Sequence, residues 1–527
     1  MTHQAPRRKG LSKSRITAFE QCPRRLWLMV YRPELAEYEN GADARFATGH
    51  AVGAIACALH PEGVMVEAEP NLSAAVATTS QLIADGHPGP IFEATFEHDG
   101  VLVRVDLLHR ADDGCWQLAE VKSSTGPKDY HLGDLATQLW VVGANGLEVS
   151  AAAIRHVDKQ FVLEREGEYG GLFADADMLV PAAAIAQNRA AVVVAARRVL
   201  AGDEPVCAMG GHCEKPFACE FVVHCSRDMP LEPEWPVTLL PGGTGKKWVG
   251  QGIFDLLDLD EGGLSARNAR ILAATRSGTP FHDAKAARAA MEPWVYPRAW
   301  LDFETINPAV PRWIGTRPYQ QVPFQFSLHL EAADGTMTHY EFLCADGSDP
   351  RRPCAEALIA AIPPSATIIA YNASFEQRVL RELARDCPDL AEPLMAMEAC
   401  TVDLLPVARE CWYHRDQRGS WSIKAVLPTL SDLDYAGLEV KDGGNAQEAF
   451  HKAIDPACTS ARRWALEQAL KAYCARDTWA MVVVARGLVG GGNREQFGNI
   501  CAKFGLGLPN TFNVFHSPVW SKYLSTF

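Results

Sequence analysis

Two groups of carboxylates in this sequence have the residue types and spacing of metal-dependent hydrolysis. The first lies within residues 104–138, where an apolar alternating segment ends in Asp106 and a second one, CWQLAEVK, carries Glu120 and Lys122. Two strands joined by the ADDG turn would bring Asp106 opposite Glu120, and side chains two apart on a strand share a face. A carboxylate pair beside an ammonium group can bind a divalent metal, orient a water and neutralise a phosphodiester. The alternative is a surface hairpin with a salt bridge.

The second group is spread over a longer stretch. Asp302 and Glu304 flank a phenylalanine in the apolar segment WLDFET, so both carboxylates lie on one face of a strand. The other members of the group follow at the ends of apolar segments or four apart on a strong helix: Glu376, Asp403, Tyr473 and Asp477. A two-metal phosphodiester-cleaving site needs about this many oxygen ligands.

A third group consists of cysteines. Cys213, Cys219 and Cys225 recur with five residues between each pair, in a loop that also carries glycine, proline and aromatic residues. In a chain kept in a reducing compartment, such spacing favours thiolate ligation of zinc or an iron–sulfur cluster. Three thiolates are one short of a closed site, and Cys22 and Cys207 are the candidates to complete it. The alternative is three unrelated buried cysteines.

Length and composition set the frame for these groups. With 527 residues, two or three domains are expected, and 48% hydrophobic against 22% charged residues describes a globular, soluble protein. The alternation of expected strands and helices indicates the α/β class. No run is long and apolar enough to span a membrane, and the N-terminus has no apolar signal region, so we expect a cytoplasmic protein. The net charge of −14 argues against a broad basic surface, although binding of nucleic acid depends on local grooves.

Two helices are expected to flank the first group. Residues 11–28 predict one amphipathic helix, capped by Ser12 or Ser14 and with Cys22 in its middle. A long helix is expected over residues 181–201. Basic residues near the N-terminus could guide a strand to the first group: Arg7, Arg8, Lys9, Arg24 and Arg25.

Strands should place the acidic residues themselves. Residues 91–108 alternate like a hairpin around His98-Asp99-Gly100, and Glu93 on its first strand is close enough to join the acidic cluster. After the E-V-K strand, a helix carries Gln138 on the same face as His131 and Asp134.

The first half of the chain resembles the RecB-like branch of the PD-(D/E)XK nucleases, on the CPRRLW segment, Asp106, the E-V-K triplet, Gln138 and the cysteine triplet. The resemblance implies a restriction-endonuclease-like core with helical flanks, Mg²⁺ or Mn²⁺ held by Asp106 and Glu120, and Lys122 as catalytic lysine. In its iron–sulfur members, one early and three late cysteines hold a [4Fe–4S] cluster, which maps onto Cys22, Cys213, Cys219 and Cys225; zinc is the alternative. Val142 stands where the motif that Gln138 begins has tyrosine, and Gly53, with His50 nearby, stands where a metal-binding histidine is common.

The second half resembles the DEDD exonucleases of the RNase H-like (DnaQ-type) fold, in the subgroup whose last motif is Y-x-x-x-D. The resemblance implies that Asp302, Glu304, Glu376 and Asp477 hold two metals and that Tyr473 positions the attacking water. Asp403 is an alternative contributor, because this chain has Glu376 where the family usually has aspartate.

The whole chain resembles a bacterial family of uncharacterised proteins that join these two nuclease types, on segments such as SKSRITAFEQCPRRLW, LDFET and GSWSIKAVLP. The expected division is a RecB-like domain over 1–230, a connector over 231–295, a DEDD-type domain over 296–490 and a tail over 491–527. The connector is either a helix–hairpin–helix-like module or a simple linker subdomain.

The expected function is a metal-dependent nuclease with two active sites, the second of 3′–5′ exonuclease type. DNA, single-stranded or at ends, is the favoured partner, alongside proteins of repair or phage-defence systems, and no membrane is expected. Three alternatives stay open: an RNA exonuclease, a non-catalytic nucleic-acid-binding scaffold, and a redox sensor built on the cluster.

Overall fold

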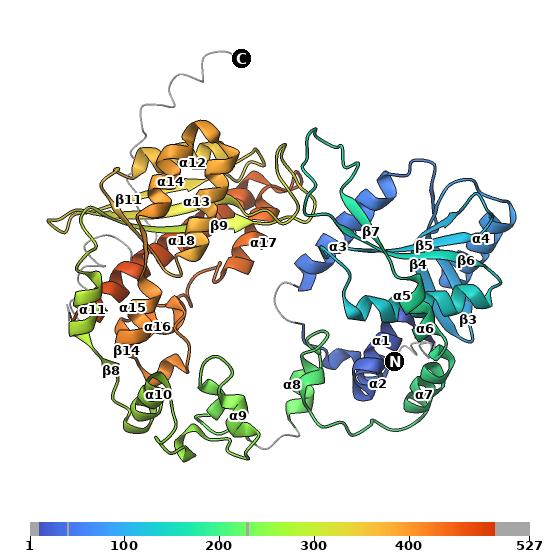
Figure 1. Ribbon diagram of the computed structural model, residues 1–527, viewed down its shortest axis with the longest axis horizontal. Helices are drawn as coiled ribbons and strands as arrows, with labels where there is room; N and C mark the ends of the chain where they lie inside the picture. The colour runs from blue at the N-terminus through green and yellow to red at the C-terminus, as the bar shows by residue number, and fades with distance from the viewer. Residues whose placement is uncertain (1–9, 39–41, 228–230, 491–527) are drawn as a thin grey trace, which may run out of the picture.

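The computed structural model describes residues 10–38, 42–227 and 231–490, which form two α/β bodies lying side by side (Figure 1). Each body is built on its own large mixed sheet. The tail expected over 491–527 and the basic residues Arg7, Arg8 and Lys9 lie outside the described residues.

The first body contains seven sheet strands and the helices that pack on them. Its elements are β1 Leu11–Ser12, α1 Lys13–Gln21, α2 Pro23–Tyr31, α3 Ala42–Ala58, β2 Val64–Met65, α4 Leu72–Ala84, β3 Ile91–His98, β4 Val101–Arg110, β5 Trp116–Lys122, α5 Asp129–Ala144, β6 Val149–Val157, β7 Phe173–Asp177, α6 Leu179–Ala186, α7 Arg189–Ala201 and α8 Val222–Ser226.

The first sheet has the strand order β2-β3-β4-β5-β6-β7, with β1 paired in parallel to β4. The expected β3–β4 hairpin is present, and it turns at Asp99 and Gly100, both with positive φ. Helix α5 packs on β3, β4 and β6, whereas α3 packs on β5. Val142 of α5 lies in one core cluster and Ala56 of α3 in another, so the sheet is covered from both sides.

The segment expected as one helix over residues 11–28 is two helices. Helix α1 ends at Gln21, Cys22 is extended with φ −162° and ψ 121°, and α2 begins at Pro23. A proline disfavours the helical conformation of the residue before it and has no N–H for a helical hydrogen bond. The placement of Cys22 in the middle of a helix is therefore wrong, and the break puts this thiol at a helix junction.

The helix expected over residues 181–201 is also broken, into α6 and α7 at an angle of 51°. The start of α7 is anchored by the buried Arg189, which pairs with Glu20 Oε1 at 2.6 Å and donates to the carbonyl of Gly133 at 3.2 Å. The apolar pattern did not indicate this bend, and the contacts of Arg189 hold the start of α7 against α1 and α5.

Within the described part of the chain, no single helix is both long and apolar enough to cross a membrane. The bent pair α6 and α7 meets that length and composition only when taken together. Val193, Ala196 and Leu200 of α7 are buried in the core of the first body.

The connector and the second body share one hydrophobic core. Connector residues such as Trp235, Leu256 and Ile271 lie in the same cluster as Trp300 and Leu470 of the second body. The elements are α9 Gly245–Val249, α10 Ala266–Ser277, β8 Phe281–His282, α11 Ala284–Met291, β9 Arg298–Ile306, β10 Val322–Glu331, β11 Met337–Leu343, α12 Arg351–Ala361, β12 Thr367–Ala370, α13 Ser374–Asp386, α14 Ala391–Ala399, β13 Thr401–Asp403, α15 Leu404–Cys411, β14 Trp412–Tyr413, α16 Ile423–Leu430, α17 Gly443–Ala453 and α18 Ser460–Leu488.

The second sheet has the strand order β11-β10-β9-β12-β13, in which β10 is antiparallel to both neighbours and β9, β12 and β13 are parallel. Leu301 and Phe303 of β9 pack in the core cluster that includes α12, α13 and α14. Trp300 lies in the cluster that includes α18, on the other side of the sheet. Because strand residues alternate between faces, Asp302 and Glu304 point toward α18.

The two bodies touch through residues 307–321, which link β9 to β10 and are called here the docking loop. Its Gly315 N–H and Thr316 carbonyl pair with the backbone of Leu163 at 2.7 and 3.0 Å. Its Ala309 is buried with Val52 and Leu172 of the first body.

Candidate functional site

The first acidic cluster lies where β4 and β5 separate. Their antiparallel ladder runs from Arg110 and Trp116 to Leu107 and Ala119 and stops there. Asp106 and Glu120, the next residues in register, are not paired through their backbones. Instead, Oδ2 of Asp106 accepts a hydrogen bond from the N–H of Val121 at 2.7 Å. This fork brings together the two carboxylates that the hairpin pattern predicted.

Glu120 is the most heavily bonded group of the cluster, with only 2% of its surface exposed. Its Oε1 accepts hydrogen bonds from Lys122 Nζ at 2.7 Å and from Lys13 Nζ, and its Oε2 accepts one from Gln138 Nε2 at 2.6 Å. Burial acts to raise the pKa of Glu120, but the two ammonium groups lower it to about 2. Glu120 is therefore ionised at neutral pH.

The pKa of Asp106 is shifted in the opposite direction from that of Glu120. Burial and the neighbouring charge of Glu120 raise the pKa of Asp106 to about 7, against the opposing effect of Lys13 and Lys122. A divalent cation at the fork would offset both effects and keep the two carboxylates ionised together. The fork thus suits Mg²⁺ or Mn²⁺, whose preferred ligands are oxygen atoms.

The remaining predicted residues of the first group take mixed positions. Gln138 also donates to the carbonyl of Arg104 at 3.0 Å, and its own Oε1 is buried with no hydrogen-bond partner within the described residues. Glu93, with a φ of 54°, lies across the β3–β4 pair from Asp106, and its carboxylate is 3.0 Å from Arg104 Nε. Glu93 is thus at the edge of the cluster, already paired with an arginine.

The two departures from the RecB-like pattern have structural counterparts. Val142 of α5 is fully buried in the core, so no polar group takes the place of the expected tyrosine. Gly53 of α3 has no atom within 4 Å of the position where a Cβ would lie, and His50 is exposed.

The second acidic cluster gathers four predicted carboxylates from three elements. Asp302 and Glu304 come from β9, Asp477 from α18 and Glu376 from the first turn of α13. Burial and the charge of Asp477 raise the pKa of Asp302 well above its ordinary value, and they raise that of Glu304 to about 8. Ionised carboxylates that lie this close in a buried site repel one another, which is unfavourable unless cations share the space.

Glu376 and Asp403 differ in what their oxygens contact. Glu376 is 3% exposed, its Oε2 is buried with no hydrogen-bond partner within the described residues, and burial raises its pKa to about 8. The Oδ1 of Asp403 accepts hydrogen bonds from the N–H groups of Leu405 and Asn372, both at 2.9 Å. Asp403 therefore caps α15 and secures the turn before α13, whereas Glu376 keeps an oxygen available to a ligand.

Two residues of the second cluster, Lys424 and Tyr435, were not predicted from the sequence. Lys424 Nζ donates to the Tyr473 hydroxyl at 3.1 Å and to the carbonyl of Lys441 at 2.6 Å. The Tyr435 hydroxyl donates to Oδ1 of Asp477 at 2.5 Å. A lone lysine in the otherwise apolar α16 was a usable signal for Lys424, but no sequence pattern ties Tyr435 to the cluster.

Cys474 adds a thiol to this cluster. Its Sγ and one carboxylate oxygen each of Asp302 and Glu304 lie within 4.8 Å of one another. Burial and the surrounding carboxylates raise the pKa of the Cys474 thiol well above its usual range, and the thiol donates to Oδ2 of Asp302 at 3.6 Å. A protonated thiol is a poor ligand, so the donor set is carboxylate oxygen and fits Mg²⁺ or Mn²⁺.

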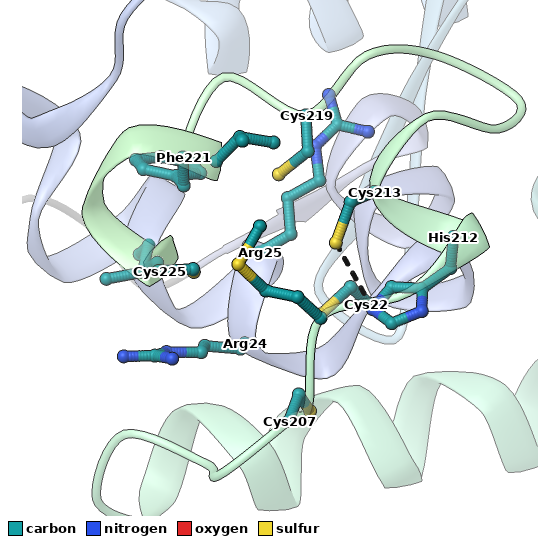
Figure 2. A pocket seen from close by; sticks show the side chains of 12 residues that line it. Cys22, Arg24, Arg25, Cys207, His212, Cys213, Cys219, Phe221 and Cys225 are labelled. Carbon is teal, nitrogen blue, oxygen red and sulfur yellow. Dashed lines mark hydrogen bonds between the residues drawn. The ribbon is translucent and has the colours of Figure 1, made fainter. Parts of the chain in front are cut away.

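The cysteines converge on one small pocket (Figure 2). Cys22 reaches it from the break between α1 and α2, and the other four come from the segment after α7: Cys207, Cys213, Cys219 and Cys225. All five are free thiols. Burial raises the pKa of Cys22, and Cys207 beside it raises it further. Thiols that converge from distant parts of a chain fit a thiolate-bound metal or cluster, and Cys207 stays a candidate ligand beside Cys22.

Side chains of α1 and α2 fasten this pocket. Gln21 Nε2 donates to the carbonyls of His212 and Phe217 at 2.7 and 2.8 Å. Arg24 pairs with Glu204 at 2.6 Å and Arg25 with Glu220 at 2.8 Å. These two arginines, expected to guide a strand to the first acidic cluster, instead hold the cysteine segment against α2.

Residues 299–422 match the family model described as "Domain of unknown function (DUF2779)". This match covers β9 to the residue before α16, and so includes three of the acidic residues of the second cluster, Asp302, Glu304 and Glu376. The comparisons with curated proteins and with solved structures found no match.

Proposed function

We propose that this chain is a metal-dependent nuclease that hydrolyses phosphodiester bonds of single-stranded DNA at two active sites. The observation that carries the proposal is the second acidic cluster, in which four carboxylates from three elements, three of them buried and Asp302 partly buried, gather beside a tyrosine. A divalent cation is the ligand that such a set of oxygens accommodates best. The first cluster adds an independent carboxylate pair with a lysine.

At the first site, Asp106 and Glu120 would hold Mg²⁺ or Mn²⁺, which when bound acidifies a water and polarises the phosphoryl oxygen. Lys122 lies 2.7 Å from Glu120 and 3.2 Å from Asp134, so its ammonium group is held beside the reacting centre. There it stabilises the negative charge that develops on the phosphate in the transition state. Gln138 orients Glu120 by its hydrogen bond to Oε2.

At the second site, Asp302, Glu304, Glu376 and Asp477 would hold the metals. Tyr473 is 4% exposed; its hydroxyl accepts a hydrogen bond from Lys424 and hydrogen-bonds to the carboxylate of Asp477. This holds the phenol beside the metal-binding oxygens, where it would position the attacking water. Lys424 also lies near Glu304 and Asp477, where it opposes the rise that burial causes in the pKa of both carboxyls, and it would supply positive charge next to the phosphate.

The folds support these assignments. The first sheet, with α5 and α3 on its two sides and acidic residues at the β4–β5 fork, agrees with a restriction-endonuclease-like core. In the second sheet, an antiparallel meander is followed by two parallel strands with helices on both faces, which agrees with an RNase H-like fold. We assign a [4Fe–4S] cluster to the cysteine pocket, with zinc as the alternative.

The test uses full-length protein purified without oxygen and supplied with Mn²⁺. We would follow degradation of end-labelled single- and double-stranded DNA and RNA by the wild type, Glu120→Gln, Asp302→Asn, the double variant, and Glu164→Gln, an exposed control. Each single variant should lose one cleavage activity by roughly a hundredfold or more, because a metal ligand is gone. The double variant should be inactive and the control unchanged.

Other results have defined meanings. Binding of DNA without any cleavage would overturn the enzyme proposal in favour of a nucleic-acid-binding scaffold. Cleavage of RNA in preference to DNA would overturn the substrate assignment. Equal activity in the wild type and the double variant would show that neither acidic cluster takes part in cleavage.

A further inference from the structure

A second lysine reaches the first acidic cluster from a distant part of the chain. Lys13 is the first residue of α1, whose cap Ser12 accepts a hydrogen bond from the N–H of Arg15 at 3.3 Å. The preceding Leu11 and Ser12 form β1, which pairs in parallel with Val101 and Leu102 of β4. Because β4 also carries Asp106, this pairing fixes the start of α1 next to the carboxylates.

Glu120 already has a hydrogen-bond partner on each carboxylate oxygen without Lys13. Lys13 Nζ donates to Oε1 of Glu120, the same oxygen that accepts from Lys122 at 2.7 Å, while Gln138 satisfies Oε2. A buried carboxylate with these two partners is already paired, and desolvating a further ammonium group is unfavourable in itself. A purely structural explanation of Lys13 is therefore weak.

Lys13 and Lys122 donate to the same carboxylate oxygen and both remain partly exposed. The side chain of Lys13 is 22% exposed, close to the 23% of Lys122, so each of the two side chains keeps part of its surface accessible. One turn along α1, Thr17 donates to Asp134 at 2.9 Å, and Asp134 lies 3.2 Å from Lys122. Two lysines thus flank the carboxylate pair and are held by one connected set of hydrogen bonds.

We propose that Lys13 binds a non-bridging oxygen of the DNA phosphodiester at the first site, as a partner of Lys122. This inference rests on the proposed nuclease function of that site. With a divalent metal on Asp106 and Glu120, repulsion between cations would favour contact of both ammonium groups with the negative charge of the substrate. Lysine suits this task because its ammonium group is a flexible point charge with three donors.

The test measures binding and cleavage in an Asp302→Asn background, which silences the second site. Lys13→Gln, Lys13→Arg, Lys122→Gln and the control Lys159→Gln, an exposed lysine of the first body, are compared. The probe is a short fluorescein-labelled single-stranded DNA, titrated at several salt concentrations with Ca²⁺ in place of Mg²⁺. Cleavage is then followed with Mn²⁺.

Lys13→Gln should weaken binding about tenfold, the effect of losing one charge-assisted hydrogen bond. The slope of log affinity against log salt should fall by about 0.7, the change for one lost phosphate contact on a single strand. Lys13→Arg should keep the wild-type slope. If Lys13 only clamps α1 to Glu120, Lys13→Gln would also keep the wild-type slope, and the proposal would be contradicted.

The outcomes separate this inference from the proposed function. If Lys122→Gln abolishes cleavage while Lys13→Gln matches Lys159→Gln in affinity, slope and rate, only the role of Lys13 is overturned. If the protein binds and cleaves no nucleic acid, the proposed function itself fails. Should Lys13→Gln not fold, Lys13→Met, which keeps the apolar stem of the side chain, replaces it. A slope equal to that of the wild type in Lys13→Met would contradict the phosphate contact, and a slope lower by about 0.7 would support it.

Discussion

At the scale of single residues, the two acidic clusters differ in how the negative charge of their carboxylates is balanced. In the first, Glu120 stays ionised because two lysines donate to it. In the second, burial raises the pKa of Glu304 and Asp477, and Lys424, shared with the hydroxyl of Tyr473, opposes this rise without cancelling it. The second cluster therefore retains protons near neutral pH and depends more strongly on metal.

This difference predicts a pH dependence of stability in metal-free buffer. The carboxyl groups of Glu304 and Glu376 have a pKa of about 8 in the folded chain and an ordinary value of 4.5. Between these values the folded chain binds more protons than the unfolded chain, so stability falls as pH rises. The melting temperature, measured in EDTA across this window, should decrease with pH in the wild type.

Two variants check the assignment of that slope. Glu304→Gln should flatten the decrease, because one of the titrating groups is gone, and Glu392→Gln, an exposed control, should not. Added Mn²⁺ should raise the melting temperature most at the alkaline end, where the metal meets no competing proton. A melting temperature that rises with pH in EDTA would contradict the prediction.

At the scale of elements, α1 connects the cysteine pocket to the first acidic cluster. Lys13 at its start contacts Glu120, Thr17 contacts Asp134, and Gln21 at its end donates to two carbonyls of the cysteine segment. Cys22 follows directly. A short helix held at both ends transmits a displacement of either end to the other, because its backbone hydrogen bonds make it stiff.

Removal of one cysteine should therefore affect the first site and spare the second. Cys219→Ser should lose the visible absorbance of an iron–sulfur cluster and lower first-site cleavage about tenfold or more. Second-site cleavage, measured in a Glu120→Gln background, should be retained. Cys115→Ser, a half-buried cysteine outside the pocket, is the matched control. A colourless wild type that contains zinc would replace the cluster assignment, and full first-site activity in Cys219→Ser would contradict the coupling.

At the scale of the whole molecule, the docking loop ties the two sites together. It begins three residues after Glu304 on β9, and its Tyr319 hydroxyl donates to the carbonyl of Ser123, the residue after Lys122. Its Pro311 carbonyl accepts a hydrogen bond from the Tyr169 hydroxyl at 3.1 Å. The loop therefore joins the neighbourhoods of both acidic clusters through a few contacts.

A charge placed in this contact should separate the bodies. Ala309 is 4% exposed in an apolar cluster, and an unpaired carboxylate there is costly to bury. Ala309→Asp should increase the radius of gyration measured by X-ray scattering, while each sheet keeps its circular dichroism signal. Ala333→Asp, at an exposed position of the second body, is the control. An unchanged radius in Ala309→Asp would mean that the docking loop does not hold the bodies together.

The sequence by itself determined which residues share a face and where most elements lie. The spacing of Asp302 and Glu304, the turn at Asn372 and the four-residue step from Tyr473 to Asp477 are local properties of strands and helices. The break before Pro23 was equally local, and the amphipathic pattern on either side of it hid the signal.

Only the tertiary structure decided which distant residues meet. Lys13 joins Glu120 because β1 pairs with β4, and Tyr435 joins Asp477 because its segment packs against α18. Asp403, acidic and well spaced, caps a helix through its Oδ1, which accepts two backbone hydrogen bonds. Such contacts depend on strand order and packing across long stretches of chain, and residue spacing along the sequence carries no record of either.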